Sequence, residues 1–247
     1  LQKKLIAFVN SNNLTSASIV AKEIINLDYS NQEAWLVYLA NAKLTNELYL
    51  FREFDNQKKG KEYNIVNYIF YSNGQLKQNN NDIARALFAI IEVSGKDDKN
   101  FIESYDYLLF YLTLALYFDP TFNEALFFQA HFYEQIKNYE MAEKIYQKIN
   151  KNHSYYLEGQ QKIVFNKVKD GNIKEAERIL ITLIQNNKDK VVFNISLADF
   201  YRITKQYNQA ILHYTNIIKL NDIDDDKLWR VLYMRGICFE RIDQWGK

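Results

Sequence analysis

Few residues in this chain have the type and spacing that catalysis or metal binding requires. The three histidines, His131, His153 and His213, lie in different segments, and none has a second ligand at the spacing of a metal site. Glu158 has no second carboxylate that can be placed beside it for general acid–base work. The sequence also has no glycine-rich phosphate loop and no Gly-x-Ser-x-Gly elbow. It therefore predicts a protein that is not an enzyme and that holds neither a metal nor a cofactor.

The single cysteine, Cys238, excludes an internal disulfide. Because it falls in the middle of an expected helix, a structural thiol is favoured over a nucleophile. A chain without disulfides fits either a reducing cytosol or an exported protein held together by its core, so the localisation is unknown. The longest apolar stretch, residues 107–118, is well short of a helix that spans a bilayer and predicts a helix buried on most sides.

The composition favours a helical fold and argues against a nucleic-acid partner. The chain has 31 Lys+Arg and 30 Asp+Glu, a net charge of +1, which creates no field that attracts polyanions. The densest basic run, residues 58–61, is no larger than an ordinary solvated loop. A hydrophobic fraction of 48% with only 7 glycines and 1 proline leaves few turn residues for a sheet. We therefore predict an all-α fold.

A fixed period organises the second half of the chain. Ala142, Ala176 and Ala210 are evenly spaced, about 34 residues apart, and apolar residues recur three places before and four and seven places after each. Such a period is typical of a helix-turn-helix solenoid, so we expect a right-handed superhelix. The expected helix pairs are residues 123–136 with 139–149, 157–169 with 173–185, and 191–203 with 207–220. Gly171 suits a left-handed residue between the paired helices.

Small residues are expected where the two helices of a pair cross, because only a small side chain lets the backbones approach. A fourth copy has Leu232 and Phe239 in register after a four-residue shift, with the acidic run 224–226 capping its helix and Trp245 in the place of Tyr207. The chain has no initiating Met and stops one residue before the next expected small residue, so we expect a fragment of a longer protein. The structural repeat positions are Ala130, Val164, Ala198 and Gly236 in the first helices and Ala142, Ala176 and Ala210 in the second helices.

The pattern is looser upstream. Ala17 and Ala21 mark a second helix, and Trp35 and Ala42 open another unit. Between residues 46 and 81 the period fails, although helices are expected over 48–56 and 63–76. A helix over 82–93, a loop at 95–98 and a long helix over 101–118, ended by Pro120, follow. We therefore divide the chain into N-terminal repeat-like helices (1–45), an irregular helical segment (46–121) and a regular array (122–247).

These positions resemble the tetratricopeptide repeat (TPR) family. The matching residues are Trp35, Pro120, Ala130, Tyr133, Ala142 and Tyr146. Residues 232–247, with Arg235-Gly236 and Gln244-Trp245, look like a segment of long bacterial proteins with many such repeats. The resemblance implies a scaffold that binds another protein or peptide on its concave face, with no nucleic acid and no transmembrane segment.

One subgroup of this family holds acidic chaperone tails with Lys and Asn spaced four apart on the first helices. The corresponding pairs here are Leu36/Ala40, Phe127/His131, Gln161/Phe165, Ile195/Asp199 and Tyr233/Ile237, and none is that clamp. A chaperone-tail function is therefore not expected, because these pairs supply no fixed cations for a carboxylate.

The resemblance places the first helices on the concave face, where aromatic anchors and charges of both signs would meet a partner. An amphipathic helix or an extended peptide would fit such a groove. Alternatively, several of these rings pack against neighbouring repeats. Two other roles stay open, a targeting arm of a larger enzyme and a self-assembly module. The predicted partner-binding residues are Phe127, Phe128, His131, Glu134, Gln161, Lys162, Phe165, Ile195, Asp199, Arg202, Tyr233 and Arg241.

Overall fold

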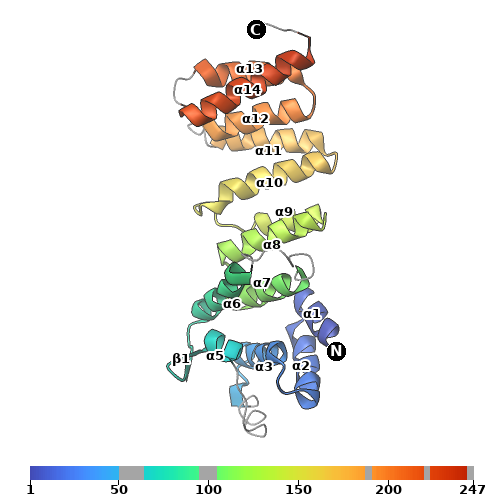
Figure 1. Ribbon diagram of the computed structural model, residues 1–247, viewed down its shortest axis with the longest axis vertical. Coiled ribbons are helices and arrows are strands. Elements are labelled where there is room, and N and C mark those ends of the chain that lie inside the picture. The colour runs from blue at the N-terminus through green and yellow to red at the C-terminus, as the bar shows by residue number, and fades with distance from the viewer. Residues whose placement is uncertain (50–63, 95–104, 187–190, 220–222, 244–247) are drawn as a thin grey trace. The chain divides into compact units, whose positions relative to one another are not determined.

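The computed structural model describes residues 1–49, 64–94, 105–186, 191–219 and 223–243. Over these residues the chain is helical apart from one short β-hairpin, as Figure 1 shows. The all-α prediction is therefore confirmed in its main feature. The elements are α1 (Gln2–Asn10), α2 (Leu14–Leu27), α3 (Gln32–Leu44), α5 (Asn64–Phe70), β1 (Tyr71–Ser72), β2 (Gln75–Leu76), α6 (Asn80–Ser94), α7 (Tyr105–Phe118), α8 (Asn123–Gln135), α9 (Tyr139–Tyr146), α10 (Tyr155–Lys169), α11 (Ile173–Asn186), α12 (Val191–Ile203), α13 (Tyr207–Lys219) and α14 (Asp225–Arg241).

The chain forms two compact units, an N-terminal unit (Leu1–Tyr155) and a C-terminal unit (Tyr156–Lys247). They do not coincide with the three segments expected from the repeat pattern, because packing and sequence similarity are different criteria. In the N-terminal unit, consecutive helices pack as pairs, and α1 also contacts α7. Trp35, Phe70 and Phe110 are among its largest fully buried side chains. The helix α7 is buried on most sides, as predicted.

The expected helix over residues 63–76 is wrong in its second half. The helix α5 ends at Phe70, and β1 and β2 pair antiparallel with Tyr71 opposite Leu76. Between the strands, Asn73 and Gly74 have φ values of 50° and 74°. An Asn-Gly pair with positive φ at both positions is the preferred two-residue hairpin turn, so it interrupts the helix here.

In the C-terminal unit the expected helices are found within a few residues of their predicted ends. The helix α12 has the predicted bounds, α10 begins two residues early and α11 extends one residue further. In the N-terminal unit α9 ends at Tyr146, three residues before the predicted Ile149. Several predictions fall outside the described residues. These are most of the helix expected over 48–56, the loop expected at 95–98, the start of the helix expected over 101–118, the basic run 58–61 and Trp245. No helix in the described parts of the chain is long and apolar enough to cross a membrane.

The turns inside the helix pairs confirm the register. Lys137, Gly171 and Lys205 have φ values of 61°, 79° and 61°, and their spacing is the same as that of the three alanines. Asp243, with a φ of 56°, follows Lys205 at this interval lengthened by the four-residue shift expected in the fourth copy. In each of the first three turns the next amide donates to a carbonyl five residues back, at 2.8 Å, which closes the end of the first helix.

The alanines expected at the helix crossings are buried. Ala130, Ala142, Ala176, Ala198 and Ala210 have no exposed surface. Val164, the larger residue at the equivalent position of α10, is also buried, but α10 and α11 approach each other less closely than α12 and α13.

The expected crossing at Gly236 is not found among the described residues. Gly236 is exposed, and a Cβ built on it meets no atom within 4 Å. The same face of α14 carries the exposed side chain of Leu232. No described helix covers this face, so the structural role expected for Gly236 is not realised here.

Enlarging a crossing residue should destabilise the protein. We expect Ala210→Leu to lower the free energy of unfolding by about 1–3 kcal/mol, because added methyl groups in a filled site force the helices apart. Urea unfolding followed by circular dichroism measures this. Ala7→Leu, the same change at an exposed position of α1, should have an effect below about 0.5 kcal/mol. Equal stability of Ala210→Leu and wild type would show that α12 and α13 do not depend on a small residue there.

Two glycine substitutions should act in opposite directions. Gly171→Ala should lower the free energy of unfolding by about 1 kcal/mol, because an L-residue is strained at a φ of 79°. Gly236→Ala should raise it by about 0.5–1 kcal/mol, because alanine in an open helical position restricts the unfolded chain and meets no neighbour. The same urea unfolding measurement compares both. A higher stability of Gly171→Ala would contradict the strain expected at the left-handed turn, and a lower stability of Gly236→Ala would contradict the open position of Gly236.

Candidate functional site

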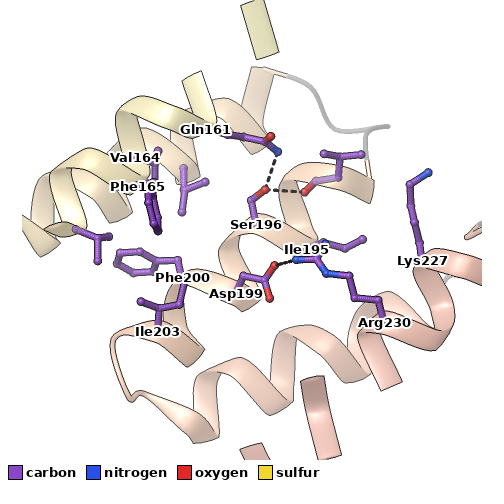
Figure 2. A pocket seen from close by; sticks show the side chains of 13 residues that line it. Gln161, Val164, Phe165, Ile195, Ser196, Asp199, Phe200, Ile203, Lys227 and Arg230 are labelled. Atoms are coloured by element: carbon purple, nitrogen blue, oxygen red, sulfur yellow. Dashed lines mark hydrogen bonds and ion pairs between the residues drawn. The ribbon is translucent and has the colours of Figure 1, made fainter. Parts of the chain in front are cut away.

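A cavity of about 360 Å³ lies in the C-terminal unit between the first helices α10, α12 and α14 (Figure 2). These helices occupy the positions that the repeat register assigns to the binding face. The cavity is apolar on one side and polar on the other. Its lining residues are Gln161, Val164, Phe165, Val168, Leu180, Val192, Ile195, Ser196, Asp199, Phe200, Ile203, Lys227 and Arg230.

The apolar side has a buried base and an exposed rim. Phe200 and Ile195 are buried, whereas Phe165, Ile203 and Val192 keep 44%, 45% and 41% of their surfaces exposed. The ammonium of Lys169 lies 4.5 Å from the centre of the Phe165 ring, which positions this ring at the edge of the cavity. Three partly exposed apolar side chains around one cavity form a surface that a partner can cover.

The polar side begins with a hydrogen-bonded pair that joins α10 to α12. The amide of Gln161 donates to the hydroxyl of Ser196 at 2.8 Å. That hydroxyl in turn donates to the carbonyl of Val192 at 2.9 Å, one turn earlier in its own helix. The Gln161 side chain is therefore held at the edge of the cavity.

Asp199 is the most highly connected residue of the site. The phenol of Tyr214 donates to its Oδ1, Arg230 from α14 donates to its Oδ2, and Arg202 approaches Oδ1 to 3.6 Å. Burial, followed by the neighbouring Asp199 carboxylate, raises the pKa of Tyr214, so this phenol remains a neutral donor at physiological pH. The contact with Asp199 places Arg230 at the edge of the cavity, as Figure 2 shows.

The structure brings four of the predicted partner-binding residues together. Gln161, Phe165, Ile195 and Asp199 line the cavity, and Arg202 contacts it through Asp199. Ile195 is buried, so it can contribute only from the base. Three further predicted residues of this unit lie outside the lining: Lys162, Tyr233 and Arg241. Tyr233 stacks on Trp229 with ring centres 5.5 Å apart, and both rings are exposed on α14.

The predicted residues of the N-terminal unit have different surroundings. Phe127 is buried and stacks on Tyr155 with ring centres 4.4 Å apart, so here the alternative that a ring packs inside the protein holds. Phe128 and His131 line a second cavity, of about 590 Å³, between α6, α7 and α8. Glu134 is not among the residues that line this cavity. Its carboxylate accepts a hydrogen bond from the Tyr146 phenol at 3.1 Å and lies 3.1 Å from the ring of His131.

Among the exposed lining residues, the sequence prediction missed Arg230, Lys227, Val192 and Ile203. It also did not name the less exposed lining residues Val168, Leu180, Ser196 and Phe200. Arg230 follows Val192 by the repeat interval plus the four-residue shift, so these two missed residues occupy the same register position. A predicted face that included this position would have contained both. Ile203 stands one place after the predicted Arg202 on the last turn of α12. Val192, Ile203 and Lys227 lie in the first or last turn of their helices, outside the part of each helix that the predicted binding face included.

The cysteine and the other two histidines considered for catalysis or metal binding, His213 and His153, contact other side chains of the protein. Cys238 has no exposed surface, and burial raises the pKa of its thiol, as a structural role requires. His213 stacks on Tyr201, with ring centres 5.2 Å apart, and burial lowers the pKa of its imidazole. His153 lies 3.5 Å from a carboxylate oxygen of Glu124. Over the described residues, no group of three or more His, Cys, Asp or Glu side chains is placed to hold a metal.

Removing the charge of Asp199 should destabilise the C-terminal unit. We expect Asp199→Asn to lower the free energy of unfolding by about 1–3 kcal/mol, because two guanidinium groups lose their shared carboxylate in a partly desolvated site. Thermal or urea unfolding followed by circular dichroism measures the change. Asp243→Asn is the matched control, since this residue is exposed and asparagine tolerates its left-handed conformation. An effect of Asp199→Asn no larger than that of the control would show that the cluster contributes nothing to stability.

No family model matches this sequence, and no curated protein matches it. Among solved structures, a tetratricopeptide repeat protein from Parabacteroides merdae is 18% identical, with a TM-score of 0.41 over 99% of this chain and 91% of that one. PilF of Pseudomonas aeruginosa is 10% identical, with a TM-score of 0.39 over 97% and 82% of the two chains. A chain of the APC/C hetero-tetramer Cut9-Hcn1 is 14% identical, with a TM-score of 0.44. The match covers 94% of the present chain but only 40% of the length of that chain.

These TM-scores are too low to carry an argument, so the assignment rests on the molecule itself. Three turns repeat at a constant interval, α8 packs on α9 and α12 on α13, and the alanines of the repeat are buried. The chain is therefore an all-α protein whose second half repeats a helix-turn-helix unit.

Proposed function

We propose that this chain is a non-catalytic scaffold that binds a peptide or a helix of another protein along the face formed by its first helices. The observation that carries the proposal is the cavity between α10, α12 and α14, with its partly exposed rim of Phe165, Ile203 and Val192. Concave sites that combine apolar walls with a few fixed polar groups are where ligands are usually bound.

The energetics favour a partner at this rim. Covering the exposed apolar surface of one such side chain contributes on the order of 1–2 kcal/mol, which is a large share of the affinity of a short peptide. The polar groups of the same cavity, Gln161 and Asp199, are held by hydrogen bonds within the protein. A partner would therefore meet side chains that need little reordering, which reduces the entropic cost of binding.

The helices give this face a fixed geometry. The buried ring of Tyr214 on α13 supports Asp199 on α12, and Asp199 in turn holds Arg230 on α14. Side chains on packed helices are positioned more accurately than side chains on loops. The arrangement therefore suits recognition of a defined segment.

Selection of short peptides tests the proposal. We would select binders to the purified chain from a random peptide library displayed on phage and measure the affinity of the enriched peptides by fluorescence polarisation. The double variant Phe165→Ala/Ile203→Ala should bind them about tenfold more weakly or worse, because it removes apolar surface from the rim. The matched control is Ile181→Ala/Leu212→Ala, which removes exposed apolar side chains from the second helices.

Three results would count against this proposal. The first is failure to enrich any peptide, the second is an equal loss of affinity in the control variant, and the third is full affinity in the rim variant. Circular dichroism must show unchanged helicity in both variants. The targeting-arm and self-assembly roles stay predictions that the same measurements do not address.

A further inference from the structure

The charges around the cavity do not balance. Asp199 is a single carboxylate, and it is contacted by the guanidinium groups of both Arg202 and Arg230. Lys227, the other charged lining residue, is paired with Asp224. The cluster of one carboxylate and two guanidinium groups therefore carries a net charge of +1 (2 − 1), in a region where the Asp199 side chain is only 15% exposed.

Both arginines retain capacity for another acceptor. The side chain of Arg230 is 51% exposed while it contacts Asp199. The Nε of Arg202 is buried and has no hydrogen-bond partner among the described residues. A guanidinium offers five N–H donors in a planar fork, so a contact with one carboxylate leaves donors for a second.

We infer that the groove binds a segment that presents a carboxylate to Arg230 beside a bulky apolar side chain in the apolar slot. Figure 2 shows the two halves of this site, with Phe165, Phe200 and Ile203 on one side of Asp199 and Arg230 on the other. Arg202 contributes a second positive charge, because it approaches the carboxylate of Asp199 as well. This inference rests on the proposed function and specifies the chemistry of the partner.

The size of the surplus favours a carboxylate over a phosphate. A carboxylate carries one negative charge and would neutralise the cluster, and it pairs with a guanidinium through two parallel hydrogen bonds. A phosphoryl group carries about 1.5–2 negative charges near neutral pH, which exceeds the surplus. Because an aspartate or glutamate side chain and a free chain terminus offer the same group, the experiment distinguishes these two sources.

The test uses a synthetic random peptide library in two forms, one with a free C-terminal carboxylate and one with a C-terminal amide. Peptides retained by the purified chain are identified by mass spectrometry and measured by fluorescence polarisation. We expect retained peptides to carry Asp or Glu near a Phe, Leu, Ile or Trp in both forms if the side chain is the source. If the source is the chain terminus, we expect retention only in the free-carboxylate form, with an apolar last residue.

Variants of the two arginines test whether the carboxylate of the peptide binds at Arg230. Arg230→Gln should weaken binding of the retained peptides about tenfold, the typical effect of losing a charge-assisted hydrogen bond, and Arg202→Gln should weaken it about threefold. Arg178→Gln is the matched control, because Arg178 is exposed on the second helix α11, and its effect should stay below about twofold. Added salt should weaken binding to wild type more than binding to Arg230→Gln.

The outcomes separate this inference from the proposed function. Peptides without acidic groups whose affinity falls in Phe165→Ala but not in Arg230→Gln would overturn the inference and leave the scaffold in place. Tighter binding of a phosphoserine peptide than of the matching glutamate peptide would also overturn it. Failure of both forms of the library to yield a binder would count against the inference and the proposed function alike.

Discussion

The distance between paired helix backbones depends on the size of one side chain at each crossing. Where that residue is alanine in both helices, as at Ala198 and Ala210, the helices α12 and α13 approach closely and the crossing is fully buried. Where it is Val164, the helices α10 and α11 stay further apart. Val164 from α10 and Leu180 from α11 line the cavity.

The polar half of the groove depends on the same packing. Tyr214 belongs to a second helix and its ring is fully buried, but its hydroxyl reaches Asp199 on the first-helix face. Asp199 then fixes Arg230, which comes from the next helix pair. A core aromatic residue thus determines where a surface cation lies, through a single carboxylate between them.

The sequence was sufficient for the parts of the fold that backbone periodicity dictates. The alanine period located the helices between residues 123 and 219 to within a few residues, because burial of one face repeats with every helix pair. The left-handed turn at Gly171 was anticipated, but those at Lys137 and Lys205 were not, because lysine carries no signal for that conformation. The hairpin at Asn73-Gly74 was missed although this pair is a hairpin signal, since the expected helix was extended across it.

The candidate site was predictable only in part. Projection of the register found Gln161, Phe165, Ile195 and Asp199, because they lie in the middle of regular helices. It placed Phe127 on the surface, whereas Tyr155 stacks on that ring from the first turn of α10, two residues before the predicted start of this helix. It also missed Arg230, because the pairing of this residue with Asp199 is a contact between helix pairs. Such contacts depend on tertiary packing that a single period does not encode.

The isolation of Cys238 has a practical consequence. It is the only thiol in the chain and has no exposed surface, because it belongs to the buried cluster on which α14 packs. A thiol reagent can react with it only when this packing opens, so the rate of labelling under native conditions reports the local opening equilibrium of the last described helix. The molecule therefore contains a built-in chemical reporter of fraying at this end, with no competing cysteine elsewhere to obscure the signal.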